Sequence, residues 1–219
     1  MESRSTRRAG RPSRPILTAD AIHRAALELI DKSGADDFSL ARLARELGVR
    51  MPSLYNHVRN RDDVISGMRT LLAAEIDSSP LRKLPWDEAL AAWARSYRDA
   101  FARHPNTVKL LATTAVRTPA VLDMYEDFVL ALEDAGWPTD QTIGLLTALE
   151  SFVLGSVLDM VAPEQMIDLS ADASRHPRLA AAVAVTPRVD RADEAFELGL
   201  AAMLSGMRRR LDEIAASAE

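Results

Sequence analysis

The sequence predicts an all-α protein. Apolar residues recur three and four positions apart along most of the 219 residues, which is the spacing of one buried helix face. No segment shows the strict alternation of apolar and polar residues that marks a half-buried strand. Glycine and proline stand between the periodic segments, where helices end and begin. With 47% hydrophobic residues, the chain can bury one large core or two small ones.

Charge divides the chain into a basic head and an acidic body. Residues 1–61 contain 12 Lys and Arg against 7 Asp and Glu, whereas residues 62–219 contain 15 against 25. The first 17 residues are rich in arginine, and we expect them to be flexible when free. Arg11 and Arg14 suit a basic arm that lies in the minor groove of DNA, and a solubilising or leftover tail is the alternative.

Two short helices that meet at a tight turn are the most informative feature. After a first helix from Thr18 to about Ser33, Ser39 can cap the next helix. Gly48 stands where that helix ends in a left-handed conformation, and Pro52 can open the helix that follows. The side chains expected to face outward from this last helix are Arg50, Ser53, Tyr55, Asn56 and His57. The pattern predicts a helix-turn-helix, whose second helix enters the DNA major groove, and the alternative is a helical hairpin with incidental surface polar residues.

The segment LGVRMPSLYNHVRNRDDV resembles the DNA-reading segment of the tetracycline-repressor (TetR) family of transcriptional regulators. The shared features are Leu-Gly-Val, a short Leu-Tyr-x-His-Val helix and a basic-Asn-basic hinge. The resemblance implies that Ser39 and Arg61 contact phosphate. By the same resemblance, the recognition positions are Arg50, Met51, Pro52, Ser53, Tyr55, Asn56 and His57. Met51 departs from the polar residue usual at its position, and we expect it to contact a thymine methyl group.

Helix signals continue to the C-terminal end. Asn60, with Asp63 three residues on, begins a helix that should run to about Asp77 and join the head to the body. Thr118 with Pro119 begins a helix that ends at Gly136. The remaining predicted helices cover residues 86–103, 107–114, 139–161, 177–185 and 190–216. We therefore expect a basic arm over residues 1–17, a helix-turn-helix domain over 18–62 and a ligand-binding and dimerisation domain over 63–219.

Small residues recur on one side of the last two long helices. Glycine inside a helix costs roughly 1 kcal/mol relative to alanine, so repeated glycines indicate a close approach between helices. The sequence leaves open whether the close partner lies in the same subunit. The resemblance implies a four-helix bundle across a homodimer, which agrees with the usual pairing of helix-turn-helix proteins on a palindrome. The candidate interface residues are Gly144, Ala148, Gly155, Gly199, Ala202 and Gly206.

Aromatic side chains mark a candidate cavity in the body. Trp93 and Tyr97 lie four residues apart on one helix face, and a plain core is the alternative interpretation. Glu150 lies in an apolar helix, where an unpaired buried carboxylate would be costly. Asp159, nine residues on, projects from the opposite side, so at most one of these two acids faces a chamber. The candidate ligand-binding residues are Trp93, Tyr97, Leu111, Thr114, Phe128, Glu150 and Phe152.

From Trp86 to Asp159 the body also resembles the tetracycline-repressor ligand domain, although more loosely. Three positions depart from that resemblance. Leu111 stands where a metal-binding His is implied, Trp93 where a ligand-holding Asn is implied, and Asp77 where another His is implied. We therefore expect no metal and no other cofactor, and an effector more apolar than a magnesium-chelated drug.

No pattern in the sequence indicates catalysis. The four histidines are scattered, and neither a Gly-rich phosphate loop nor a nucleophile elbow occurs. The absence of cysteine excludes disulfides and thiolate zinc sites. We find no secretory leader and no run of about 18 apolar residues, so we expect a cytoplasmic protein without a membrane segment.

Together these features predict a ligand-responsive DNA-binding regulator that is not an enzyme. We expect a homodimer, most simply a repressor, that binds a palindromic operator in double-stranded DNA and is released by a small-molecule effector. An activator, or a regulator controlled by a partner protein, is one alternative. An α-helical module that sequesters a hydrophobic compound is another, and a gel shift against the chain's own upstream DNA would distinguish it.

Overall fold

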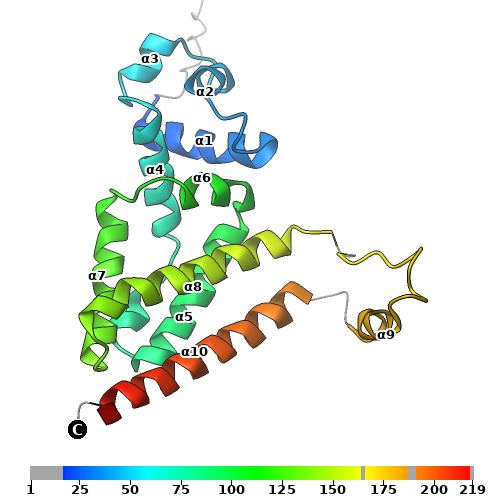
Figure 1. Cartoon of the computed structure of the whole chain (residues 1–219). Coiled ribbons are helices and arrows are strands. Elements are labelled where there is room, and N and C mark those ends of the chain that lie inside the picture. Colours follow the sequence, from blue (N-terminus) through cyan, green and yellow to red (C-terminus); the bar gives the residue numbers. More distant parts are fainter. Residues whose placement is uncertain (1–16, 164–165, 187–190, 218–219) are drawn as a thin grey trace, which may run out of the picture.

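The structure is a computed structural model that describes residues 17–163, 166–186 and 191–217 (Figure 1). Within these ranges it contains helices and no strand, so the all-α prediction is confirmed. The helices are α1 (Ala19–Ser33), α2 (Leu40–Glu46), α3 (Met51–Tyr55), α4 (Arg61–Ala73), α5 (Trp86–Ala102), α6 (Val108–Ala112), α7 (Pro119–Asp134), α8 (Thr139–Met160), α9 (Pro177–Val185) and α10 (Arg191–Ser217). Two 3₁₀ turns, η1 (Ser79–Arg82) and η2 (Pro105–Thr107), lie on either side of α5.

Three predicted caps occur at the starts of helices. The Thr18 hydroxyl oxygen accepts the Ala21 N–H at 3.1 Å, and Ser39 does the same for Arg42 at 3.3 Å. The Asn60 side-chain oxygen accepts the Asp63 N–H at 2.9 Å. Each bond satisfies one of the N–H groups that a first helical turn leaves without a partner. The chain's local sequence therefore determines where α1, α2 and α4 begin.

Thr118 behaves differently from the expected cap. It precedes Pro119 at the start of α7, as predicted, but its side chain makes no capping bond. Its hydroxyl instead donates to the backbone oxygen of Ser66 on α4, at 3.4 Å. Pro119 has no N–H of its own, and the buried Thr118 side chain finds its acceptor on the neighbouring helix. This residue therefore contributes to the contact between α4 and α7.

The helix predicted to reach Asp77 ends earlier, at Ala73. A turn follows, in which the Ile76 N–H donates to the Ala73 oxygen at 3.2 Å. The turn buries Ile76 and allows the Asp77 N–H to donate to the Ser96 hydroxyl of α5 at 2.7 Å. The chain therefore leaves the helical conformation after Ala73. The burial of Ile76 and the bond from Asp77 to Ser96 stabilise this turn in place of a further turn of α4.

The helices form a head and a body that α4 connects (Figure 1). The head consists of α1, α2 and α3, and α4 packs against α1 at its upper part and against α7 and α5 below. In the body, α5 and α7 both contact α8, and α10 contacts α8 and α5. Because α4 contacts both units, the expected domain boundary after residue 62 lies within a continuous helix and remains a prediction.

One body helix, α8, is long and apolar enough to cross a membrane by length and composition alone. This helix was not singled out from the sequence because polar residues such as Glu150 interrupt its apolar run, and length and composition alone do not place it in a membrane. Of its 22 residues, only Thr142, Leu146, Leu149, Val153 and Val157 are buried within the described chain. Ile143 and Leu158 on this helix are at least half exposed. A soluble form of this protein therefore requires a cover for the outer face of α8.

The contact between α1 and α4 depends on a glycine. A Cβ atom placed on Gly67 would lie 2.1 Å from the ring of His23, so the imidazole packs directly on the α4 backbone. Burial lowers the pKa of His23, and the nearby Asp63 and Asp20 act in the opposite direction. The absence of a side chain at Gly67 therefore determines how closely the head approaches α4.

Gly67→Ala should lower the melting temperature. The added methyl group forces the His23 ring out of its position, at a cost of about 1–3 kcal/mol, which exceeds the roughly 0.5–1 kcal/mol that alanine gains in a helix. The double variant His23→Ala/Gly67→Ala should recover most of the loss. A thermal melt that places Gly67→Ala level with the parent protein would show that the imidazole moves aside without cost.

Candidate nucleic-acid interface and ligand cavity

The α2–turn–α3 unit has the geometry of a helix-turn-helix. Gly48 ends α2 with a φ of 64°, a conformation that an L side chain rarely adopts. The Val49 N–H then donates to the Ala44 oxygen at 2.9 Å, which closes the turn. Leu54 and Val58 are buried and hold α3 on the head. The opposite face of α3 is therefore free to contact another molecule.

The residues expected to read DNA lie mostly on this outer face. Tyr55 is 51% exposed, and Arg50, Pro52, Asn56 and His57 are also exposed. Ser53 is half-buried. Met51 is half-buried and packs against the core, so only part of its side chain can meet a base. Arg11 and Arg14, the candidate minor-groove residues, lie outside the described residues.

The two candidate phosphate contacts lie at the starts of helices: Ser39 precedes α2, and Arg61 is the first residue of α4. Ser39 is exposed; its oxygen accepts the capping N–H, and its hydroxyl hydrogen can still be donated. Arg61 is exposed, with its guanidinium 5.5 Å from the centre of the Phe38 ring. Phe38 is buried, so this cation–π contact positions a long side chain at the head surface.

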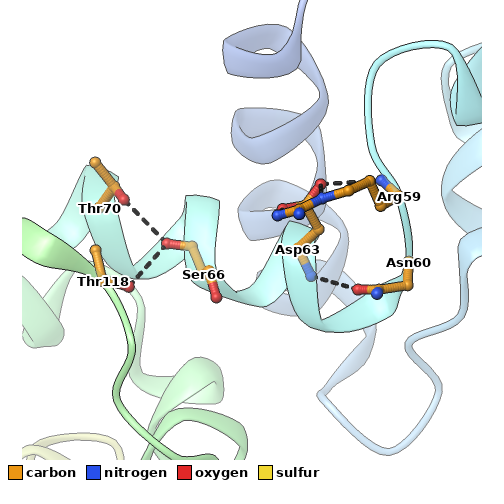
Figure 2. A network of polar contacts seen from close by, with 6 residues as sticks. All are labelled: Arg59, Asn60, Asp63, Ser66, Thr70 and Thr118. Carbon is orange, nitrogen blue, oxygen red and sulfur yellow. Dashed lines mark hydrogen bonds and ion pairs between the residues drawn. The ribbon is translucent and has the colours of Figure 1, made fainter.

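Asp63 of α4 forms hydrogen bonds with two residues of the hinge between α3 and α4 (Figure 2). Asp63 donates its N–H to Asn60, and its carboxylate accepts the backbone N–H of Arg59 at 2.9 Å. The Arg59 guanidinium also pairs with Asp63 at 3.0 Å, and these bonds lower the pKa of the Asp63 carboxyl. The first turn of α4 is therefore fixed to the hinge segment that follows α3.

The body contains a cavity of about 210 Å³ beneath the head. Residues from α4, α5, α7, α8 and the α6 region line it. Its apolar wall consists of Leu72, Ala73, Ile76, Phe101, Leu111, Ala112, Val116, Val121, Met124 and Leu154. Its polar side chains are Arg69, Tyr97, Thr114, Tyr125, Thr147, Glu150 and Ser151. Such a mixture of apolar surface with a few polar groups is typical of small-molecule sites.

Four of the candidate ligand-binding residues line this cavity: Tyr97, Leu111, Thr114 and Glu150. Trp93 and Phe128 do not, because both are fully buried in the core with their rings 5.2 Å apart. Trp93 still contacts the cavity wall indirectly, since its ring lies 5.0 Å from that of Tyr97. On this face of α5, Trp93 therefore belongs to the core and Tyr97 to the cavity wall. The plain-core interpretation applies to Trp93, and the cavity interpretation applies to Tyr97.

Phe152 also lies away from the cavity. The cavity side of α8 carries Thr147, Glu150, Ser151 and Leu154, at the helical spacing of one face. Phe152, two residues after Glu150, projects roughly 200° round the helix and stacks on Phe196 of α10, with ring centres 5.4 Å apart. Phe152, which was predicted to bind ligand, therefore contributes to the contact between α8 and α10.

Glu150 is the acid that faces the cavity. Its Oε1 accepts the Tyr125 hydroxyl at 2.5 Å. Burial raises the pKa of the Glu150 carboxyl, against the opposite effects of Tyr125, Tyr97 and Arg69. Asp159 lies elsewhere and pairs with Arg191 at 2.9 Å. The prediction that at most one of these two acids faces a chamber is therefore confirmed.

Arg69, which was not among the candidate residues predicted from the sequence, connects α4 to the cavity wall. Its buried guanidinium donates to the backbone oxygens of Leu111 at 2.6 Å, Thr114 at 2.8 Å and Ala115 at 3.0 Å. The signal was available, because Arg69 follows Ile65 by four residues and precedes Leu72 by three, on the buried stripe of α4. An arginine on such a stripe requires acceptors, and here they are carbonyl groups at and beyond the end of α6.

The segment around α6 also contacts the head directly. The Nδ1 atom of His104 lies 2.7 Å from the Asp31 carboxylate of α1. The Asn106 amide donates to the Asp31 backbone oxygen at 2.9 Å, and Lys109 pairs with Asp36 at 2.7 Å. The cavity wall at Leu111 and Thr114 is thus a few residues from contacts to α1 and is bonded to α4 through Arg69.

The small residues of α8 and α10 have two different environments. A Cβ atom on Gly199 would lie 2.6 Å from the Phe152 ring of the same chain, so this close approach is intramolecular and Gly199 is not open to a partner. Cβ atoms on Gly144, Gly155 and Gly206 would meet no atom within 4 Å. Ala148 and Ala202 are exposed. These five residues remain the candidate interface.

Comparison with known proteins agrees with this geometry. Residues 22–68 match the family described as bacterial regulatory proteins, tetR family, and residues 80–211 match the tetracyclin repressor-like, C-terminal domain. The tetracycline repressor protein class E of Escherichia coli is 29% identical over 199 residues, which covers 90% of this chain and 93% of the relative. ActR of Streptomyces coelicolor, solved in complex with actinorhodin, is 25% identical, with a TM-score of 0.72 over 89% of this chain and 98% of that chain.

The chain therefore belongs to the TetR family of transcriptional regulators. It is a ligand-responsive DNA-binding regulator, in which the helix-turn-helix head and the body with its cavity correspond to the two matched regions.

Glu150→Gln should raise the stability of the protein at neutral pH. A carboxyl whose pKa is raised by folding contributes stability that is complete below the unfolded value of about 4.5 and is lost as the pH rises through the folded value. Glutamine removes this loss and keeps an acceptor for Tyr125. Thermal melts should place the variant a few degrees above the parent at pH 7, with the difference shrinking towards pH 4.5.

The matched control is Glu126→Gln, which changes an exposed acid on α7 and should leave the melting temperature nearly unchanged at both pH values. A Glu150→Gln protein that melts well below the parent at pH 7 would contradict the inferred cost of burying the carboxylate.

Proposed function

We propose that two copies of this chain repress transcription by binding a palindromic operator, and that a small apolar or amphipathic effector in the body cavity releases them. The observation that carries this proposal is Arg69, which joins the cavity wall to the helix that leads to the reading head. We further propose that the protein is cytoplasmic, has no catalytic activity and binds no metal.

On DNA, the exposed face of α3 would enter the major groove. Arg50 can donate two hydrogen bonds to guanine, while Tyr55 and His57 position the helix or contact bases. Ser39 and Arg61 would hold phosphates on either side of α3, which fixes the register without reading sequence. Two heads of a dimer would lie about 34–36 Å apart, in successive major grooves.

Release would pass through the α6 region. An effector that contacts Leu111 and Thr114 changes the position of the carbonyl groups that hold Arg69, and α4 then pivots with the head attached to it. An effector can shift this equilibrium only by its differential affinity for the two positions of α4. Coupling of this kind is typically worth about 1–3 kcal/mol.

A second copy of the chain is the proposed cover for α8 and α10. The outer faces of these helices, which lie side by side in Figure 1, expose Ile143, Leu158 and Leu198 next to open glycines. Helix α9 contains no buried residue and lies apart from the other body helices (Figure 1). Exposed apolar side chains on the outer faces of two neighbouring helices are typical of an interface between subunits.

The proposed effector is not a magnesium-chelated tetracycline. The tetracycline repressors among the relatives are named for that drug. In this chain Leu111 lines the cavity at the position where the family resemblance implies a metal-binding histidine. Its apolar side chain offers no ligand to a cation, so the cavity favours a different molecule.

Tyr55→Ala should reduce operator affinity by tenfold or more. Its melting temperature should stay within a few degrees of that of the parent protein, because the ring is exposed. Arg61→Ala should weaken binding similarly on all DNA sequences, and the slope of log binding constant against log salt concentration should shrink by roughly 1 per half-site. Gel shifts and salt titrations against the chain's own upstream DNA provide the measurement. Loss of cooperative unfolding in Tyr55→Ala would instead identify a structural residue.

Arg69→Met should lower both stability and operator affinity. Three carbonyl groups lose a charged donor, and each such bond is worth about 1.5–3 kcal/mol, so the melting temperature should fall by several degrees. Below that temperature, operator affinity should fall at least severalfold because α4 is no longer held. Thr70→Ala is the matched control, since its exposed hydroxyl bonds within α4 to Ser66. Unchanged operator affinity in folded Arg69→Met would refute this coupling.

Leu198→Asp should prevent dimer formation, because it places a charge on the proposed interface at a side chain that is 75% exposed in the single chain. Sedimentation should show a monomer, and operator affinity should fall by more than tenfold. Leu130→Asp, on α7, is an exposed apolar control that should remain dimeric. A dimer of unchanged stability in Leu198→Asp would place the interface elsewhere.

A further inference from the structure

One charged group in the cavity can still accept hydrogen bonds from a ligand. Four titratable side chains line it: Arg69, Tyr97, Tyr125 and Glu150. The guanidinium of Arg69 is directed at three backbone oxygens and is therefore occupied. The Oε1 of Glu150 accepts the Tyr125 hydroxyl. Among the described residues, no side chain forms an ion pair with Glu150, although an ionised carboxylate can accept about four hydrogen bonds.

We propose that the effector is an amphipathic cation, with a protonated amine that donates to the Glu150 carboxylate and a compact apolar body that fills the rest of the cavity. This inference rests on the proposed function of the cavity as an effector site and names the chemical class of its ligand. Neither the family match nor the names of the relatives assign such a class.

A cation is favoured over other head groups by the balance of charge. Burying a carboxylate is costly, and the Arg69 guanidinium, which is bonded to backbone oxygens and not to Glu150, offsets only part of that cost. A cation in direct contact with the carboxylate offsets more of it. A neutral donor supplies a hydrogen bond without the charge, and an anion is repelled.

The apolar wall determines the remainder of the molecule. Leu72, Leu111, Val121 and Met124 present hydrocarbon surface around the acid, and Phe101 adds an aromatic ring. A volume of about 210 Å³ lies below the roughly 300–1,000 Å³ of pockets that hold drug-sized ligands. A body of one or two fused rings therefore suits the cavity better than a four-ring drug.

Three probes with the same bicyclic body test the inference: 1-naphthylmethylamine, 1-naphthylmethanol and 1-naphthoic acid. Calorimetric titration of the full-length protein at pH 7 should show the amine binding at least tenfold more tightly than the alcohol, with the acid weakest. In Glu150→Gln, the advantage of the amine over the alcohol should disappear. In Asp159→Asn, which changes an acid of the same helix outside the cavity, the advantage should persist.

Equal binding of the three probes, tightest binding of the acid, or no binding at all would overturn the inference. An amine preference that survives in Glu150→Gln would also overturn it, since another group would then recognise the cation. A gel shift with the chain's upstream DNA separates this inference from the proposed function. If the amine binds as expected but does not release DNA, the ligand class stands and the proposed route of release fails.

Discussion

The bonds from the Arg69 guanidinium to three backbone oxygens are the interaction on which the two halves of this protein depend. They join α4 to the segment that ends α6, which forms part of the cavity wall and lies beside contacts to α1. Because a buried guanidinium without acceptors is costly, α4 and this segment cannot separate independently. The position of the head is therefore linked to the shape of the cavity by a requirement for hydrogen bonding.

Helix α8 performs three tasks with three faces. Glu150 and its neighbours face the cavity, Phe152 faces α10, and Ile143 with Gly144 faces outward. A helix with three such contacts has apolar residues almost all round, which explains why it resembles a membrane span by composition. Glu150 is the one carboxylate of this helix that lines the cavity, whereas Asp159 pairs with Arg191 near the end of the helix.

The sequence predicted features that depend on neighbouring residues and missed those that depend on distant ones. The caps at Ser39 and Asn60 and the turn at Gly48 involve residues within five positions, so local rules were sufficient. The bonds of Arg69 span 42 to 46 residues, and the Tyr125–Glu150 bond spans 25. The role of Phe152 was misjudged for the same reason, since helical spacing shows which residues share a face and not which element covers that face.

The magnitudes agree with a switch of this design. A regulator needs a coupling of about 1–3 kcal/mol between its two sites, and one hydrogen bond to a charged group contributes about 1.5–3 kcal/mol. A ligand that weakens a single bond of Arg69 therefore supplies enough free energy to shift the position of α4, and no larger rearrangement of the core is needed. A ligand that fills the cavity without moving the carbonyl groups of Leu111 or Thr114 would bind equally well to both positions, and such a ligand would leave DNA binding unchanged however tightly it is held.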